Sequence, residues 1–373
     1  MLIASRADNS WLGRWWFSVD RWLLGALMIL ICIGFYLVAG ASPAVAIRIG
    51  APPFHFIYNH LFVQSLGIIG MIAVSTFPPK RVRLLAILAT VGILALLIMV
   101  PIIGEEIKGA RRWIHLPGFS LQPSEFIKPS LAVVMAWLFA RAIDVPGFRG
   151  RVIGIALYGV TVLLLLLQPD FGMTFLVTAI FGVQFFMTGI PYWLVAGLII
   201  LLICGGIAGY FMFPHFNARI NKFMSPETTE SYQIDRSLEA FHHGGLLGTG
   251  PGQGKVKFHI PDAHADFVFS VAGEELGLIW TLVIAGLFAF ILGRGFMLAL
   301  NSRDLFTTLA LAGLLTQLGL QAMIHMASTL SLIPTKGMTL PFLSYGGSST
   351  LALSYGMGMV LALTRRGSAR EDK

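Results

Sequence analysis

The chain has 373 residues, of which 56% are hydrophobic and only 12% are charged. A soluble domain carries about twice that charged fraction, roughly 25%, so the composition excludes a soluble globular protein. Apolar runs recur along the whole length, each with the roughly 17–25 residues that a membrane helix needs. The runs are continuous and do not alternate as barrel strands do.

The net charge of +8 requires no nucleic-acid partner, because cationic loops also orient membrane proteins. We therefore predict an all-α, polytopic membrane protein with a single membrane domain, residues 1–373.

The apolar runs predict ten transmembrane helices. They fall near 22–41, 57–77, 84–103, 124–141, 151–168, 171–188, 192–213, 267–293, 305–326 and 344–364. The tryptophan-rich residues 1–21 predict an interfacial segment that leads into an uncleaved first span. Between the fifth and sixth spans, Gln168-Pro169-Asp170-Phe171-Gly172 predicts either a very tight turn or one long broken helix.

An even number of spans places both termini on the same side of the membrane. The short, acid-poor loops on that side carry many basic residues, which marks the side as cytoplasmic. These residues are Arg6, Arg14, Arg21, Lys80, Arg81, Arg83, Arg141, Arg149, Arg151, Arg294, Arg303, Arg365, Arg366, Arg370 and Lys373. The tail 365–373 is then cytoplasmic, and the long loop of about 214–266 is periplasmic.

The opposite face also carries basic residues, which the topology bias does not explain. They are Lys108, Arg111, Arg112, Arg219, Lys222, Arg236, Lys255, Lys257 and Lys336. An anionic ligand at this face would explain their presence. The glycine-rich stretch 244–254 predicts irregular backbone that a phosphate can approach closely, although such stretches are more often simple turns.

Asp266 is the leading catalytic candidate, because it stands where the long loop enters an apolar span. A carboxylate there is costly unless it is used or paired; helix capping is the alternative role. Glu274 and Glu275 would lie about 12–13 Å further along a helix that rises ~1.5 Å per residue, which disfavours a hydrolase with two carboxylates roughly 6.5–9.5 Å apart. One carboxylate among cations suits a transferase, in which a base activates a hydroxyl and cations stabilise a pyrophosphate leaving group.

Two further groups of residues are candidates for substrate binding. Glu125 and Lys128 share one helix face at the start of a span, where they either neutralise each other or line a polar cavity between helices. Arg111 and Arg112 offer guanidinium groups suited to phosphate, and Trp113 beside them offers an aromatic face for a sugar or lipid. Surface anchoring is the alternative for these three residues.

Several segments together resemble the SEDS (shape, elongation, division, sporulation) family. They are 109–114, 122–128, 168–172, 232–234, 244–248, 264–267, 273–277 and 340–349. The resemblance covers nearly the whole chain, with the segments in the same order. The segment 334–341 resembles the division member of the family; the elongation member, our second choice, usually lacks a lysine at the position of Lys336.

The resemblance implies a peptidoglycan glycosyltransferase that polymerises lipid II in the bacterial inner membrane at the division septum. Asp266 falls on the family's key aspartate, which would deprotonate the acceptor's 4-hydroxyl for attack on the donor's anomeric carbon. Undecaprenyl-pyrophosphate would leave, with inversion from α to β. Glu125 and Lys128 match the family's charged pair in a central cavity, and Trp113 matches a position implicated in function. Our own candidates for phosphate contacts are Arg111, Arg112, Lys255 and Lys336.

The family also implies partners. These are a class B penicillin-binding protein, an FtsI-like transpeptidase, and other membrane proteins of the division machinery. A divalent cation, Mg or Mn, is a possible cofactor of the family, although no ligand cluster in the sequence demands one and we assign no metal ligand. A lipid II flippase that needs no general base and a non-catalytic division scaffold are the rival functions. A generic transporter is disfavoured because no inverted repeat is evident.

Overall fold

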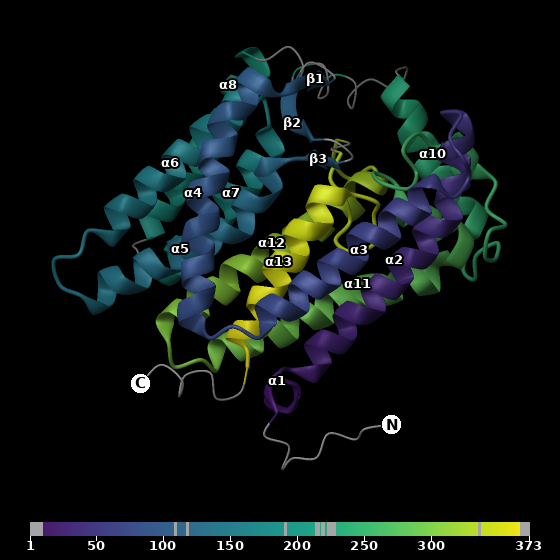
Figure 1. The fold of residues 1–373 in the computed structure, drawn as a ribbon. Helices are drawn as coiled ribbons and strands as arrows, with labels where there is room; N and C mark the ends of the chain where they lie inside the picture. Colours follow the sequence, from purple (N-terminus) through teal and green to yellow (C-terminus); the bar gives the residue numbers. More distant parts are fainter. Residues whose placement is uncertain are drawn as a thin grey trace.

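The computed structural model describes residues 10–107, 110–116, 119–189, 192–212, 217, 221, 229–334 and 337–365. Long helices run side by side through the molecule, and short strands and loops lie at one end (Figure 1). The helices are α1 (Trp11–Ser18), α2 (Arg21–Arg48), α3 (His55–Ser75), α4 (Pro79–Ile103), α5 (Pro123–Asp144), α6 (Gly150–Leu167), α7 (Phe171–Met187), α8 (Tyr192–Met212), α10 (Thr229–Gly244), α11 (Val268–Leu300), α12 (Leu305–Thr329) and α13 (Gly347–Leu363). The prediction of an all-α, polytopic membrane protein is confirmed.

Each of the ten expected spans coincides with a helix, namely α2 to α8 and α11 to α13. Within the described residues, seven helices are long and apolar enough to cross a membrane. The shorter apolar helices are Phe171–Met187, Ile203–Met212 and Gly347–Leu363. Between α6 and α7 the chain makes the tight turn, since the side chain of Asp170 caps α7 by accepting a hydrogen bond from the Met173 amide at 3.3 Å.

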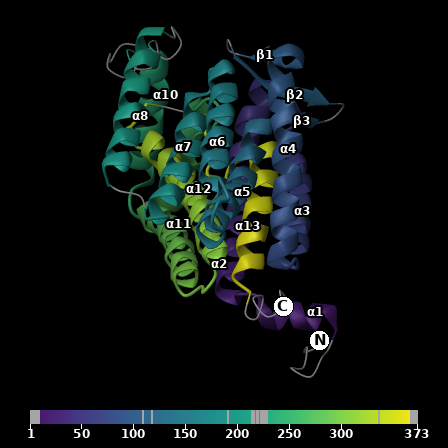
Figure 2. The ribbon, with the colours of Figure 1, turned by 90° about the vertical axis from the view of Figure 1, so that its left-hand side faces the viewer.

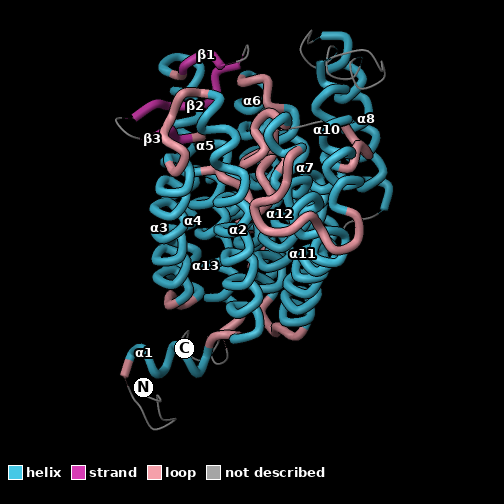
Figure 3. The backbone as a smooth tube through the Cα atoms, turned by 90° about the vertical axis from the view of Figure 1, so that its right-hand side faces the viewer, coloured by secondary structure: helices cyan, strands magenta, loops and turns pink. Residues whose placement is uncertain are grey.

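Two features were not predicted from the sequence. The connection between α4 and α5 forms a three-stranded antiparallel sheet of β1 (Glu105–Ile107), β2 (Ala110–Leu116) and β3 (Phe119–Leu121). The expected loop of about 214–266 contains α10 and the short 3₁₀ helix η1 (Val256–His259). The sheet and α10 lie at the same end of the bundle (Figure 3).

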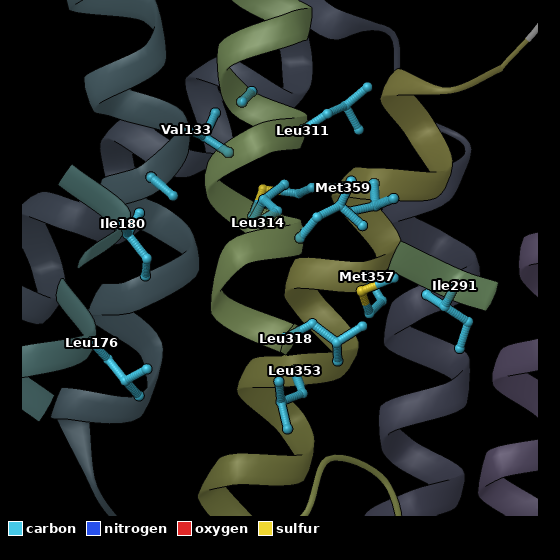
Figure 4. Packing of buried hydrophobic residues seen from close by; sticks show 14 of the residues in the cluster. Val133, Leu176, Ile180, Ile291, Leu311, Leu314, Leu318, Leu353, Met357 and Met359 are labelled. Atoms are coloured by element: carbon cyan, nitrogen blue, oxygen red, sulfur yellow. The ribbon is translucent and has the colours of Figure 1, made fainter. Parts of the chain in front are cut away.

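The helices differ in how much of their surface faces other helices. In the most apolar 18-residue windows, 72% of α5 and 78% of α12 are buried, against 22% for α3, α4 and α6. The exposed residues of α3, α4 and α6 include many large apolar side chains, such as Phe62, Leu88 and Leu163, as a lipid-facing surface requires. The buried helices interlock through side chains such as Leu318 of α12, which lies beside Leu353 and Met357 of α13 (Figure 4).

Helix α1 and the end of α13 meet at one end of the bundle (Figure 2). Arg365, just after α13, donates to Ser18 Oγ at 2.9 Å and to the Thr76 carbonyl at 2.8 Å. At the same end, Arg294 forms an ion pair of 2.7 Å with Asp20, the N-cap of α2. The two ends of the described chain therefore lie on the same side of the bundle, as an even number of spans requires.

Helix α11 is broken at Gly277, whose φ of 77° and ψ of −177° are not helical. The glycine-rich stretch 244–254 replaces the hydrogen bonds that the break removes. The amides of Thr249 and Gly250 donate to the carbonyls of Glu274 and Glu275, and the amides of Leu278 and Ile279 donate to the carbonyls of Gly245 and Leu246, at 2.9–3.3 Å. A Cβ atom on Gly248 would lie 2.2 Å from the Glu275 carbonyl oxygen. The described backbone of this stretch thus approaches the protein's own helix, where glycine is sterically required.

The carboxylates of Glu274 and Glu275 are buried beside this break. Glu274 accepts hydrogen bonds from the amides of Lys255, Val256 and Lys257 at 2.6–2.9 Å, and its Oε1 lies 2.9 Å from His243 Nδ1. Glu275 is paired with the ammonium of Lys257, which also donates to the Gly40 carbonyl at 2.8 Å. The Tyr36 hydroxyl donates to Glu275 at 3.2 Å. We call Tyr36, His243, Lys257, Glu274 and Glu275 the Glu274–Glu275 cluster.

The cluster predicts a large stability cost for removing one charge. In Lys257→Met the Glu275 carboxylate would remain buried without its cation, which costs on the order of 3 kcal/mol. We expect a clearly lower unfolding temperature in detergent. The double variant Lys257→Met with Glu275→Gln leaves no uncompensated charge from this pair and should recover part of the loss; equal unfolding temperatures for wild type and Lys257→Met would contradict this role.

Candidate functional site

Asp266 lies in the turn that precedes α11, and its side chain is partly buried. Its backbone amide donates to the Asp262 carbonyl at 3.0 Å. The two residues before it are held from outside the turn: the His264 carbonyl accepts from the Tyr345 amide at 2.9 Å, and the Ala265 carbonyl accepts from Ser344 Oγ at 2.7 Å. The turn is therefore fixed by the chain that leads into α13.

The segment that follows α12 also forms a wall beside the Asp266 carboxylate. A Cβ atom on Gly337 would lie 3.1 Å from Asp266 Oδ2, so the backbone of residue 337 is close to the carboxylate. Met338 and Leu340, further along, are buried. We call residues 337–340 the 337–340 segment. It leaves one side of Asp266 closed by backbone, while Gly337 itself lies at the surface.

His264 supports the Asp266 turn through packing. Its ring centroid lies 4.4 Å from that of Phe56 and 5.1 Å from that of Tyr345. Burial lowers the pKa of His264 to about 4, against a smaller opposing effect of Asp262. The imidazole is consequently neutral at neutral pH and acts as an aromatic spacer between α3 and the chain before α13.

Glu125 and Lys128 form a buried ion pair, which is one of the two arrangements expected from their spacing, with Nζ and Oε2 2.8 Å apart. Lys128 also donates to Gln321 Oε1 of α12 at 3.1 Å. The Gln321 amide in turn donates to the Thr339 carbonyl and to Ser349 Oγ, both at 3.2 Å. The pair is thus hydrogen-bonded to the wall of Asp266 through Gln321, which the sequence did not single out because a neutral amide creates no charge pattern.

Lys128 also lines a pocket between α5 and α7. Gln184 of α7 is its other polar residue, and the remaining lining is apolar: Leu131, Ala132, Met135, Val177, Ile180 and Phe181. This pocket is mostly apolar and its lining does not include Glu125, so the expectation that the charged pair lines a polar cavity remains a prediction.

The candidates Arg111, Arg112 and Trp113 lie on β2. Arg112 donates to the carbonyls of Gln168 and Pro169 and lies 3.9 Å from Asp170, so it holds the turn between α6 and α7. Arg111 is exposed, donates to the Pro101 carbonyl at 3.1 Å and lies 3.8 Å from Glu106. Trp113 is partly buried and pairs with Glu105 across β1 and β2. Their roles in phosphate and substrate contact remain predictions.

The remaining cationic candidates are Lys255 and Lys336. Lys255 is exposed at the start of η1, and its backbone amide is held by Glu274. Lys336 lies outside the described residues. Among the residues that are described, no group of three or more His, Cys, Asp or Glu side chains is arranged to hold a metal ion. The use of Mg or Mn as a cofactor therefore remains an expectation.

The fold and the site define a polytopic membrane protein whose candidate carboxylate lies in the turn before α11. Residues 21–369 match the FTSW_RODA_SPOVE family, described as cell cycle protein, and the chain belongs to this family. It is 46% identical to the probable peptidoglycan glycosyltransferase FtsW of Caulobacter vibrioides over 97% of this chain and 93% of the relative. The SEDS resemblance, and within it the resemblance to the division member, is confirmed.

Solved structures show the same fold. The rod shape determining protein RodA of Thermus thermophilus is 27% identical, with a TM-score of 0.70 over 94% of this chain and 97% of that one. A chain from a structure described as the structural coordination of polymerization and crosslinking by a peptidoglycan synthase complex is 28% identical. Its TM-score is 0.75, and the match covers 94% of this chain and 98% of that chain.

The depressed pKa of His264 predicts a dependence of stability on pH. Because its folded pKa of about 4 lies below the ordinary 6.5, the unfolded chain binds a proton more readily between these values. The contribution of neutral His264 to stability is complete above pH 6.5 and is lost as the pH falls towards 4, by up to about 3 kcal/mol.

This dependence is measured by thermal unfolding in detergent across that pH range. The matched variant is His264→Phe, which keeps an aromatic ring against Phe56 and Tyr345 but does not titrate. We expect the unfolding temperature of the wild type to fall more steeply with decreasing pH than that of the variant. Parallel curves would show that His264 is not held neutral by burial.

Proposed function

We propose that this chain is a peptidoglycan glycosyltransferase that polymerises lipid II, with Asp266 as its general base. The observation that carries the proposal is the construction around Asp266. One carboxylate stands at the head of α11, in a turn clamped by Ser344 and Tyr345 and beside the backbone of Gly337. A general base needs such fixed geometry, because proton transfer requires a heavy-atom distance of roughly 2.6–3.2 Å from the attacking hydroxyl.

In the proposed reaction Asp266 takes the proton of the acceptor sugar's 4-hydroxyl. The hydroxyl oxygen forms a bond to the anomeric carbon of the donor as the bond to the pyrophosphate oxygen breaks. Undecaprenyl-pyrophosphate leaves as an anion, so no general acid is required, and the configuration inverts from α to β. Glu274 and Glu275 do not serve as second carboxylates, since both are buried and bonded within the Glu274–Glu275 cluster.

The leaving pyrophosphate requires cations at the same face. Arg111 and Lys255 have exposed positions suited to this role, and Lys336 stands directly before Gly337 in the sequence. Arg112 is already bonded to the turn between α6 and α7, so its first contribution is to hold that turn. Lys128 is buried and lines the pocket between α5 and α7, and its proposed role is to orient substrate inside the bundle.

A crosslinking partner is part of the proposal. The similar solved chain comes from a complex described as coordinating polymerization with crosslinking, which supports a class B penicillin-binding protein as the partner of this chain. The similarity to a relative named FtsW supports action in the plasma membrane at the division septum, together with other division proteins.

Asp266→Asn tests the general base directly. The substitution is nearly isosteric and keeps hydrogen bonding, but the amide cannot accept a proton, so we expect loss of polymerisation by at least about 10²-fold with an unchanged unfolding temperature. The assay is glycan-strand formation from purified lipid II by the purified protein with its penicillin-binding partner. An active variant would overturn the assignment. If wild type itself makes no product while the partner is active, lipid transport or scaffolding becomes the better account.

Gly337→Ala tests the wall beside the carboxylate. The added methyl would lie 3.1 Å from Asp266 Oδ2, so the carboxylate must move by a few tenths of an ångström, and we expect about tenfold slower polymerisation. Gly286→Ala on α11 is the matched control, because a Cβ atom there meets nothing within 4 Å. Equal rates for the two variants would show that the wall does not position Asp266.

A further inference from the structure

We propose that Gln321 and His325 of α12 are positioning residues, which hold the 337–340 segment against Asp266. This inference rests on the proposed function and adds two residues that act on the general base without touching substrate. The two side chains are four positions apart, so they lie on the same face of α12. Both are buried, with 1% and 0% of their surface exposed.

Each residue binds the backbone of the segment at a different position. His325 Nδ1 lies 2.7 Å from the Met338 carbonyl oxygen. A carbonyl only accepts, so Nδ1 carries the proton, which fixes the tautomer of the imidazole. One turn earlier on α12, Gln321 donates to the Thr339 carbonyl at 3.2 Å and to Thr339 Oγ1 at 3.3 Å.

These bonds define where Gly337 lies. Met338 follows Gly337 directly, so the His325 bond fixes the Met338–Thr339 peptide, one peptide beyond the residue whose backbone lies close to the carboxylate. On the other side of the segment, the Leu340 amide donates to Ser344 Oγ at 2.8 Å, and the same hydroxyl donates to the Ala265 carbonyl beside Asp266. The segment is consequently tied to α12 at one face and to the Asp266 turn at the other.

Gln321 also connects this arrangement to the Glu125–Lys128 pair. Its Oε1 accepts from Lys128 while its amide nitrogen donates to Thr339 and Ser349. A rearrangement of Lys128 would alter the hydrogen bonds of Gln321 and thereby the support of the 337–340 segment. The charged pair of α5 is thus connected through α12 and the 337–340 segment to the turn that carries Asp266.

The test uses His325→Leu and His325→Asn in the full-length protein with its penicillin-binding partner. The leucine variant keeps the bulk and loses the donor. The asparagine variant keeps a nitrogen donor at the same number of bonds from Cα as Nδ1. We expect kcat for lipid II polymerisation to fall about tenfold in the leucine variant with KM little changed, because a misplaced base slows chemistry more than binding. Asparagine should restore most of kcat.

Three controls separate this proposal from its alternatives. Asp266→Asn in the same assay tests the proposed function itself, so its failure is distinguished from failure of the positioning role. Gln317→Met removes a buried amide of α12 that has no hydrogen-bond partner among the described residues, and it should leave kcat unchanged. Gln321→Met supplies a second test if His325→Leu does not fold, and it should lower kcat in the same way.

Two results would overturn the proposal. One is an unchanged kcat in folded His325→Leu and Gln321→Met. The other is an equal loss in His325→Leu and His325→Asn at equal unfolding temperatures, which would show that the donor to Met338 is not what matters.

Discussion

The Glu274 carboxylate organises the end of the molecule that carries the candidate site. It is fully buried and accepts hydrogen bonds from three successive amides at the start of η1. A buried charge is tolerated only when it is paired and hydrogen-bonded, so this carboxylate determines where the chain of residues 255–257 lies. Glu275 beside it holds Lys257 and, through Tyr36, joins the same loop to α2.

The break in α11 follows from the same arrangement. The non-helical backbone at Gly277 interrupts the hydrogen bonds of α11. Backbone groups left without a hydrogen bond are costly in a membrane protein. The glycine-rich stretch supplies the missing donors and acceptors, which is possible because glycine permits the close approach of two backbones. The loop that ends at Asp266 is therefore fastened to the first turns of the helix that Asp266 precedes. Asp266 owes its position to this fastening and to the chain before α13.

Much of the fold was predictable from the sequence, because continuous apolar runs identify the membrane spans. The tight turn at Asp170 was one of the two arrangements predicted, because Pro169 and the N-capping residue Asp170 are adjacent there. The small sheet was not predictable: its strands are short and are stabilised by pairing between β1, β2 and β3. Helix α10 was not predicted either, because its sequence is polar and lies within the long loop.

The candidate site was predictable only in part. Asp266 and the Glu125–Lys128 pair stand out because charges at the mouths of apolar spans are costly. Gln321 and His325 do not stand out, since their importance depends on partners that lie 18 and 13 residues further along the chain. From the sequence, Lys257 was one of the basic residues expected to bind an external anion, but in the structure its partner is Glu275. Charge patterns indicate that a group needs a partner, and only the structure identifies it.

The most direct measurement is a structure of the Asp266→Asn protein bound to a lipid-linked disaccharide acceptor. The substitution would stop the reaction and preserve the shape of the site. The account predicts the acceptor's 4-hydroxyl oxygen at roughly 2.6–3.2 Å from the amide at position 266, with Gly337 still packed beside it. An acceptor whose hydroxyl lies elsewhere, for example against the Glu125–Lys128 pair and far from position 266, would contradict the account.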